Sequence, residues 1–330
     1  MGDPGVSADR PRVLILGGGF AGVGAAKELV KADAEVVLVD RHDYHTFQPL
    51  LYQLATGLLE TTAVGHSLRD LLERQENTSI HKATVSAIDL DAREATFAEI
   101  SPLSYDYLVL GLGAEVNFFG TDGAEDHAFA MYTLPNAVRL KDHLLERWEA
   151  AERDPSLVED GALNVVIVGG GPTGVETAGA VAELYRADFA KDYPSLPQEQ
   201  ARITLVEAGP ELFSMFKPKI REYTAKALTD RTVEVKTGAM VSSVSPTRVT
   251  LKSGEELKAH TLVWGAGLQG NRLVQTLGLE LQRGNRIAVG PDLTLPDRPE
   301  VYALGDIAAI MDEKTQQVLP QLGSVGLQSG

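Results

Sequence analysis

Runs of consecutive apolar residues mark the buried strands of this chain, and two of these runs lead directly into three glycines. The runs are VLIL at residues 13–16 and VVIV at residues 165–168, and a stretch rich in alanine and valine follows each glycine turn. A strand that is apolar at every position is typical of a parallel sheet covered on both faces. The pattern therefore predicts two strand–turn–helix units.

The second half of the chain repeats the plan of the first. After the first helix come AEVVLVD (34–40), an alternating region (78–100) and YLVLG (107–111); after the second come RITLVE (202–207), an alternating region (233–257) and TLVWG (261–265). Gly17 and Gly111 are 94 residues apart, and Gly169 and Gly265 are 96 apart, which indicates an internal repeat. Each repeat is predicted to contain a βαβ start, a small antiparallel β meander and a closing buried strand.

Two further segments complete the predicted elements. The run EVYALGD at 300–306 has no glycine turn of its own, so we expect it to complete one of the earlier sheets. The segment 134–154 places Leu140, Leu144 and Trp148 on one face of a predicted helix.

We therefore predict an α/β protein with two Rossmann-like dinucleotide-binding domains, each carrying a small antiparallel β meander. The first domain is expected to be split, with residues 1–118 plus 284–330, and the second to be inserted as residues 119–283.

Composition narrows the classes of function. The formal net charge of −16 argues against nucleic acid and against a flat anionic membrane surface as partners. The absence of cysteine excludes disulfides, thiolate metal sites and iron–sulfur clusters, so electron chemistry must belong to a bound organic cofactor. The histidines have no metal-ligand spacing, so no metal is expected. The N-terminal MGDPGVSADRPR lacks the apolar core of a secretory signal, and no apolar run approaches the roughly 18 residues of a membrane span, so a cytoplasmic location is expected.

Both glycine turns fit the pattern G-x-G-x-x-G. Its first glycine allows the tight turn, its second lets the backbone approach a pyrophosphate, and its third lets helix and strand pack closely. These positions are Gly17, Gly19 and Gly22 in the first turn and Gly169, Gly171 and Gly174 in the second. Each turn follows a predicted strand and opens a helix, whose free N–H groups suit phosphate. Two turns predict two dinucleotides, a flavin that stays bound and a nicotinamide that exchanges, although a tight turn without a ligand is the structural alternative.

An acidic residue follows each turn at the end of a predicted strand. Asp40 lies 18 residues after Gly22, whereas Glu207 lies 33 after Gly174 because a proline-interrupted loop at 192–200 delays it. Each carboxylate is expected to bind an adenosine ribose. An extra 2′-phosphate beside Glu207 would meet like charge, so NADH is favoured over NADPH.

These residues resemble the two-dinucleotide flavoproteins of the pyridine nucleotide-disulfide oxidoreductase superfamily and, within it, most of all the type II NADH:quinone oxidoreductases. The marks are GGGFAG (17–22), HTFQPLLYQLATG (45–57), GGGPTGVE (169–176) and VYALGDIA (301–308). The resemblance implies FAD and NADH as cofactors, with hydride passing from NADH to FAD and electrons then reducing a quinone. It implies a membrane contact only through a C-terminal region and, in a full-length form, a peripheral position on the cytoplasmic face of the inner membrane. Whether the protein forms a homodimer is left open.

The resemblance also implies the site residues. For FAD they are Gly17, Gly19, Gly22, Asp40, Arg41, Gln48, Val85, Gly113, Gly305, Asp306, Gly323 and Ser324. For NADH they are Gly169, Gly171, Thr173, Gly174, Glu207 and Gly267. The pair Gly305-Asp306 is implied to contact the ribityl and phosphate part of the flavin, and Gln48 with Pro49 to wrap its isoalloxazine ring.

Glu176 and Gln328 are the catalytic candidates. The position that matches Glu176 in the first turn is Gly24, so the carboxylate is peculiar to the second half. The resemblance implies that Glu176 handles a proton during quinone reduction; the alternative is a carboxylate stabilised by the helix dipole.

The segment after the Gly-Asp pair departs from the family pattern. Relatives carry a segment like Ala-Gln-x-Ala-x-Gln-Gln, whereas residues 323–329 read GSVGLQS, so that Ser324 and Ser329 replace glutamines and Gln328 matches. The family continues into a C-terminal amphipathic anchor, while this sequence stops at Gly330. Three hypotheses follow: a quinone reductase, an NADH-dependent reductase of a soluble acceptor (a ferredoxin-like protein, a dye or oxygen), and a non-catalytic flavoprotein redox sensor.

The remaining candidates favour structural roles. His42 and His45 lie beside the flavin segment, but hydride transfer between two cofactors needs positioning more than acid–base help. The pair Phe118-Phe119 is expected to pack at a domain crossover rather than to line an acceptor channel, and Trp264 to lie in the core.

Overall fold

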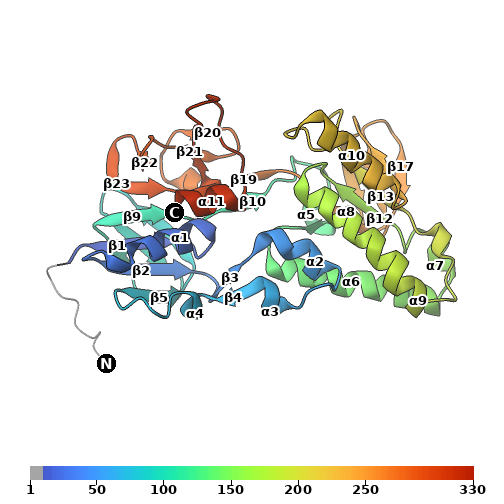
Figure 1. Ribbon diagram of the computed structural model, residues 1–330, viewed down its shortest axis with the longest axis horizontal. Helices are drawn as coiled ribbons and strands as arrows, with labels where there is room; N and C mark the ends of the chain where they lie inside the picture. The colour runs from blue at the N-terminus through green and yellow to red at the C-terminus, as the bar shows by residue number, and fades with distance from the viewer. Residues whose placement is uncertain (1–9) are drawn as a thin grey trace. The chain divides into compact units, whose positions relative to one another are not determined.

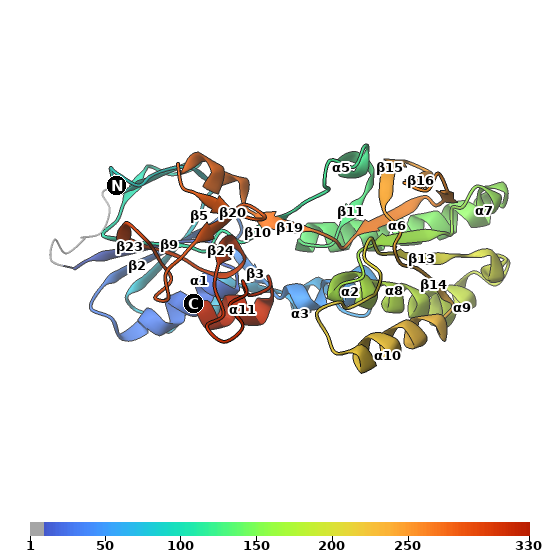
Figure 2. The same cartoon turned by 90° about the horizontal axis from the view of Figure 1, so that it is seen from above.

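The computed structural model describes residues 10–330 and separates into two compact units. Of these residues, the first unit comprises 10–46, 65–115 and 268–330, and the second comprises 47–64 and 116–267. Figures 1 and 2 show the elements of each unit. Most of the N-terminal stretch for which no secretory signal was expected lies outside the described residues.

The first unit is built on a six-stranded sheet with strand order β22-β23-β9-β1-β2-β5. Its pairs are parallel except for the pair formed by the edge strand β22, as expected when connections of a dozen or more residues join the parallel strands. The first part of the run at 300–306 lies in β23, which pairs with β9, so the expectation that this run completes an earlier sheet is confirmed. The strands are β1 (Arg12–Leu16), β2 (Glu35–Asp40), β5 (Thr78–Lys82), β9 (Tyr107–Leu110), β22 (Thr294–Leu295) and β23 (Arg298–Ala303).

Smaller elements surround this sheet. Strands β6, β7 and β8 form the predicted antiparallel meander, but the start of the alternating region, β5, joins the parallel sheet instead. The meander and small-sheet strands are β3 (Tyr44–Thr46), β4 (Gly65–Ser67), β6 (Val85–Asp89), β7 (Glu94–Phe97), β8 (Leu103–Ser104), β20 (Leu281–Gln282), β21 (Arg286–Ala288) and β24 (Ala308–Ala309). The α-helices are α1 (Phe20–Glu28), α4 (Leu68–Leu71) and α11 (Gly323–Ser329), and β10 (Ala114–Val116) pairs with β19 (Leu268–Gly270).

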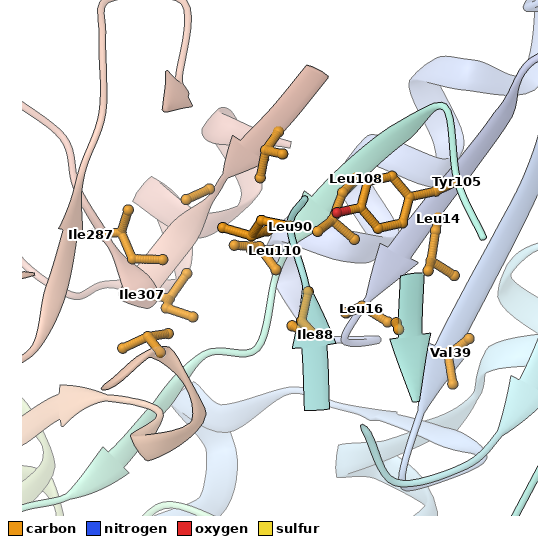
Figure 3. Close-up of a cluster of buried hydrophobic side chains, with 14 of the residues drawn as sticks. Leu14, Leu16, Val39, Ile88, Leu90, Tyr105, Leu108, Leu110, Ile287 and Ile307 are labelled. Atoms are coloured by element: carbon orange, nitrogen blue, oxygen red, sulfur yellow. The ribbon is translucent and has the colours of Figure 1, made fainter. Parts of the chain in front are cut away.

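Apolar side chains from the sheet and the meander form one core layer of the first unit. Figure 3 shows Leu14 and Leu108 from the central strands beside Ile88 from the meander. Strands β1 and β9 are buried at nearly every position, whereas β6 is buried only at Ile88, which explains why the central strands are continuously apolar and the meander is not.

The second unit repeats this plan with a five-stranded parallel sheet of order β11-β18-β12-β13-β14. An antiparallel meander of β15, β16 and β17 matches that of the first unit. The strands are β11 (Phe129–Ala130), β12 (Val165–Val168), β13 (Ile203–Val206), β14 (Val233–Lys236), β15 (Val241–Ser245), β16 (Arg248–Leu251), β17 (Glu256–Lys258) and β18 (Thr261–Trp264). The α-helices are α2 (Leu51–Ala55), α3 (Thr61–Val64), α5 (Ala124–His127), α6 (Leu134–Arg153), α7 (Ser156–Glu159), α8 (Pro172–Leu184), α9 (Ala190–Asp192) and α10 (Pro218–Thr229).

Helix α6 confirms the predicted apolar face. Leu140, Leu144 and Trp148 are all fully buried. The Trp148 ring lies edge-on to Tyr185 at a centroid distance of 4.9 Å, in the π-helical continuation of α8. The helix is therefore held by burial of one stripe.

The units differ from the expected domain limits at residues 116–118, which fall in the second unit, and in two longer segments. Residues 47–64 pack within the second unit, because α2 lies against α6 and α8. Residues 268–283 pack within the first unit, because β20 pairs with β21, which in turn pairs with β24. Local patterning does not reveal either assignment, since both depend on contacts between segments far apart in the chain.

Within residues 10–330, no helix combines the length and the apolar character required to cross a bilayer.

Candidate functional site: two glycine turns

The first glycine turn has the geometry expected of a phosphate-binding turn. Gly17 has a φ of +112°, which only glycine adopts readily, and a Cβ on Gly22 would lie 1.8 Å from the Gly17 carbonyl oxygen. By contrast, a Cβ on Gly19 would meet no atom within 4 Å. The first and third glycines are therefore required by the protein's own packing, whereas the second leaves open space at the N-cap of α1.

The second turn reproduces this geometry. Gly169 has a φ of +113°, and a Cβ on Gly174 would again lie 1.8 Å from the carbonyl oxygen of the first glycine. Gly171 is the N-cap of α8, with nothing within 4 Å of a Cβ built on it. Pro172 follows at the first helical position, where its missing N–H costs nothing. Both turns thus present a bare backbone and a helix N-terminus, the features that receive a pyrophosphate.

The two acidic residues bind the turns directly. Asp40 accepts hydrogen bonds from the N–H groups of Gly18 (2.6 Å) and His42 (2.7 Å). Glu207 accepts from the N–H groups of Gly170 (2.5 Å) and Gly209 (2.5 Å). Each carboxylate therefore fixes its turn and keeps lone pairs for a further donor such as a ribose hydroxyl.

Sequence reasoning missed the middle glycines, Gly18 and Gly170. A Cβ on Gly18 would lie 2.7 Å from the Leu68 side chain, and one on Gly170 would lie 2.7 Å from the Leu212 side chain and 2.9 Å from a Glu207 carboxylate oxygen. The signal was the third consecutive glycine in both turns, which the G-x-G-x-x-G pattern does not require.

Gly24 and Glu176 hold equivalent positions with different surroundings. A Cβ on Gly24 would lie 3.3 Å from the Gly330 Cα and from the Leu327 carbonyl oxygen, because α11 packs closely against α1. In the second unit the matching face of α8 lines a groove of about 340 Å³ instead. The groove residues are Tyr52, Gln53, Leu58, Val175, Glu176, Gly179, Ala180, Glu183, Tyr223, Thr224, Ala227, Leu228 and Arg231.

Burial raises the pKa of Glu176 above its ordinary value of 4.5. The side chain as a whole stays exposed, so the effect comes from groove atoms that displace part of the hydration of the carboxyl group. A carboxyl group with a raised pKa can carry a proton at a higher pH than an ordinary glutamate, which is the property a proton donor needs.

The FAD candidates near the C-terminus fall on one turn and one short helix. Gly305 has a φ of +67° and begins the 3₁₀ turn Gly305–Ile307 that contains Asp306. Gly323 opens α11, where a Cβ on it would lie 3.1 Å from the Phe20 ring. Ser324 and Gln328 are exposed on the same helix.

The other FAD candidates are more dispersed. Arg41 is exposed directly after β2, Val85 is half-buried against the core, and Gly113 has a φ of +68°. Gln48 lies in the second unit, where its amide donates to the Tyr132 carbonyl at 3.2 Å. The turn residues Gly17 to Gly22 and Asp40 therefore belong to the first unit, whereas Gln48 belongs to the second.

The remaining NADH candidates lie in the second unit with the second turn. Thr173 is in the first turn of α8, and its carbonyl accepts from the Thr177 hydroxyl at 2.6 Å. Gly267 has a φ of +68°, and a Cβ on it would lie 2.5 Å from the Phe119 ring. Gly267 is therefore required by the packing around it.

The candidate histidines and Trp264 make contacts typical of residues with structural roles. His45 is buried, its Nδ1 lies 3.0 Å from the Gly18 carbonyl oxygen, and burial lowers its pKa. Burial likewise lowers the pKa of His42, which stacks on Tyr44. Trp264 is buried, as expected. Among residues 10–330 no group of three or more His, Cys, Asp or Glu side chains has metal-binding geometry.

The chain is similar in sequence to known oxidoreductases. A family model described as pyridine nucleotide-disulphide oxidoreductase matches residues 11–330. A type II NADH:quinone oxidoreductase of Mycobacterium tuberculosis is 35% identical over 321 residues, covering 93% of this chain and 68% of that protein. An internal alternative NAD(P)H-ubiquinone oxidoreductase of Arabidopsis thaliana mitochondria is 30% identical, with 99% of this chain and 67% of that protein covered.

Solved structures support the same fold. The structure of NDH2 from Plasmodium falciparum in complex with NADH has a TM-score of 0.85 at 24% identity. The match covers 92% of this chain and 65% of that one, so the chain spans about two thirds of that relative.

Proposed function

The chain belongs to the pyridine nucleotide-disulphide oxidoreductase family, as an enzyme similar to the type II NADH:quinone oxidoreductases, and on this premise we propose that it is an FAD-dependent NADH dehydrogenase that passes electrons to a quinone. The observation that carries the proposal is the repeated constellation of a bare glycine turn, a helix N-terminus and a carboxylate bonded to the turn. Two such constellations provide for two dinucleotides in one chain.

We assign FAD to the first turn and NADH to the second. Helix α11 packs on α1 beside the first turn, and the turn at Gly305 adds a second backbone contact point in the same unit. The equivalent face of α8 lines an open groove. More protein around the first turn suits a cofactor that is retained, and less around the second suits one that exchanges.

The protein's own contribution is binding and orientation. N–H groups at the starts of α1 and α8 would bind the pyrophosphates, and Asp40 and Glu207 would each accept from a ribose hydroxyl. FAD held at the first glycine turn would supply the hydride-accepting and electron-donating chemistry between NADH and the acceptor. Glu176 is the proposed group for proton delivery, since its raised pKa favours the protonated form.

An anaerobic titration tests this function. Protein loaded with FAD is titrated with NADH while the visible flavin absorption is followed, and a water-soluble quinone is then added. We expect bleaching by NADH and recovery with quinone. Absence of flavin binding or of bleaching would refute the proposal.

A soluble acceptor is the second candidate. Ser324 and Ser329 stand where the resemblance implies two glutamines; Ser324 is exposed, and the Ser329 hydroxyl bonds to the protein backbone instead of facing an acceptor. Flavin that bleaches with NADH, stays bleached with quinone and recovers with oxygen or an acceptor protein would favour this candidate.

A further inference from the structure

Ser329 makes two hydrogen bonds through its hydroxyl group within the first unit. The Gly305 N–H donates to the Ser329 oxygen at 3.0 Å. The same hydroxyl donates to the Gly326 carbonyl at 2.9 Å, in the preceding turn of α11. One serine therefore ties the last turn of a helix to a loop 24 residues earlier.

The bond reaches the one position of that loop where the backbone is most constrained. Gly305 has a φ of +67°, and a Cβ on it would lie 3.2 Å from Ala21 Cβ and 3.5 Å from Gly326 Cα. The loop is held from a second side by Gln321, whose amide donates to the Asp306 carbonyl at 2.9 Å. The Gly305 N–H and the Asp306 carbonyl are thus both hydrogen-bonded to side chains of the segment 321–329.

Helix α11 is itself placed by close contacts with α1, the helix that begins at the first glycine turn. A Cβ on Gly326 would lie 3.3 Å from Phe20 Cβ, and one on Gly330 would lie 2.1 Å from the Ala21 carbonyl oxygen. Small residues let the two helix backbones approach, so the position of Ser329 is defined relative to the glycine turn. A longer side chain at 329 would not fit the same short hydroxyl bridge.

We propose that Ser329 is a positioning residue for FAD, which holds the Gly305–Asp306 turn at a fixed distance from the first glycine turn. The inference rests on the proposed assignment of FAD to the first unit. Ser329 does not contact the cofactor in this proposal; it sets the conformation of the turn that does. Without its hydroxyl, the Gly305 N–H loses its partner and the turn must be reordered each time FAD binds.

The test measures the FAD dissociation constant of apoprotein variants by quenching of flavin fluorescence. Ser329→Ala is expected to raise the dissociation constant about tenfold, and Ser329→Thr, which keeps the hydroxyl, to stay within about threefold of wild type. Gln321→Ala should weaken FAD binding in the same direction. The matched control is Thr276→Ala, because the Thr276 hydroxyl also donates to a carbonyl three residues earlier (Leu273, 2.7 Å) in the same unit.

Two further readouts separate positioning from general destabilisation. NADH binding to the second unit should be unchanged in Ser329→Ala, and the melting temperature of its apoprotein should fall no further than that of Thr276→Ala. Equal FAD dissociation constants for Ser329→Ala and Thr276→Ala would overturn the proposal, as would a loss of FAD binding matched by an equal loss of NADH binding. If wild-type protein binds no FAD at all, the proposed function itself fails.

Discussion

Glu207 should control the choice between NADH and NADPH. The perturbation is Glu207→Gln, which removes the charge and keeps the shape. At about 4 Å and an effective dielectric of 20, the carboxylate repels a 2′-phosphate charge by about 4 kcal/mol. Because Glu207 is only partly buried, we halve this figure to about 2 kcal/mol, or about thirtyfold in affinity.

The substitution also has a cost that both nucleotides share. The carboxylate accepts from Gly170 and Gly209, and an amide can accept at only one of its two ends, so one N–H loses its partner. Absolute affinities are therefore expected to fall for both nucleotides. The ratio of the two dissociation constants cancels this shared cost and isolates the charge effect.

The assay follows quenching of intrinsic fluorescence, since Trp148 and Trp264, the two tryptophans of the chain, both lie in the second unit. The preference for NADH over NADPH should fall about thirtyfold in Glu207→Gln. The control is Glu222→Gln, which removes the same charge from an exposed position on α10 and should leave the preference unchanged. A shift of less than about threefold in Glu207→Gln would refute the electrostatic argument.

Three further predictions follow from the second unit. Gly174→Ala should destabilise the unit and abolish NADH binding, because its Cβ would lie 1.8 Å from the Gly169 carbonyl oxygen; calorimetry and nucleotide titration check this. Glu176→Gln should become progressively more stable than wild type as the pH rises above 4.5. The pKa of Glu176 is higher in the folded protein than in the unfolded chain, so ionisation of this carboxyl group destabilises the wild type, whereas glutamine does not ionise. Urea unfolding at several pH values checks this. Leu144→Ala should cost about 2–5 kcal/mol of unfolding free energy, because the side chain is fully buried on α6.

Each of these has a control within the same unit. Gly179→Ala places a Cβ in open space on the same helix as Gly174 and should stabilise by about 0.5–1 kcal/mol. Asp160 serves as the control for Glu176, because its hydrogen bonds to Arg248 and His260 lower the pKa of its carboxyl group: Asp160→Asn should lose stability relative to wild type as the pH rises. Leu145, the exposed neighbour of Leu144 on α6, is the control for Leu144→Ala: Leu145→Ala should change the unfolding free energy little. Equal effects in any variant and its control would contradict the corresponding prediction.

The fold class, the internal repeat and the two glycine turns could all be predicted from the amino-acid sequence. These follow from local rules: a strand buried on both faces must be apolar throughout, and a turn with φ near +112° must be glycine. For the same reason the acidic residues Asp40 and Glu207 could be found from their places at strand ends, and the buried face of α6 from its helical spacing.

The contacts between segments far apart in the chain could not be predicted in this way. Only the packing of α2 against α6 and α8 places Gln48 in the second unit. Only the approach of α11 to α1 explains why Gly24 is glycine where the second half has Glu176, and turns Ser329 from a departure in a motif into a hydrogen-bond partner of Gly305. Such contacts depend on the close packing of backbones far apart in the chain, a property that no local pattern of hydrophobic and polar residues encodes.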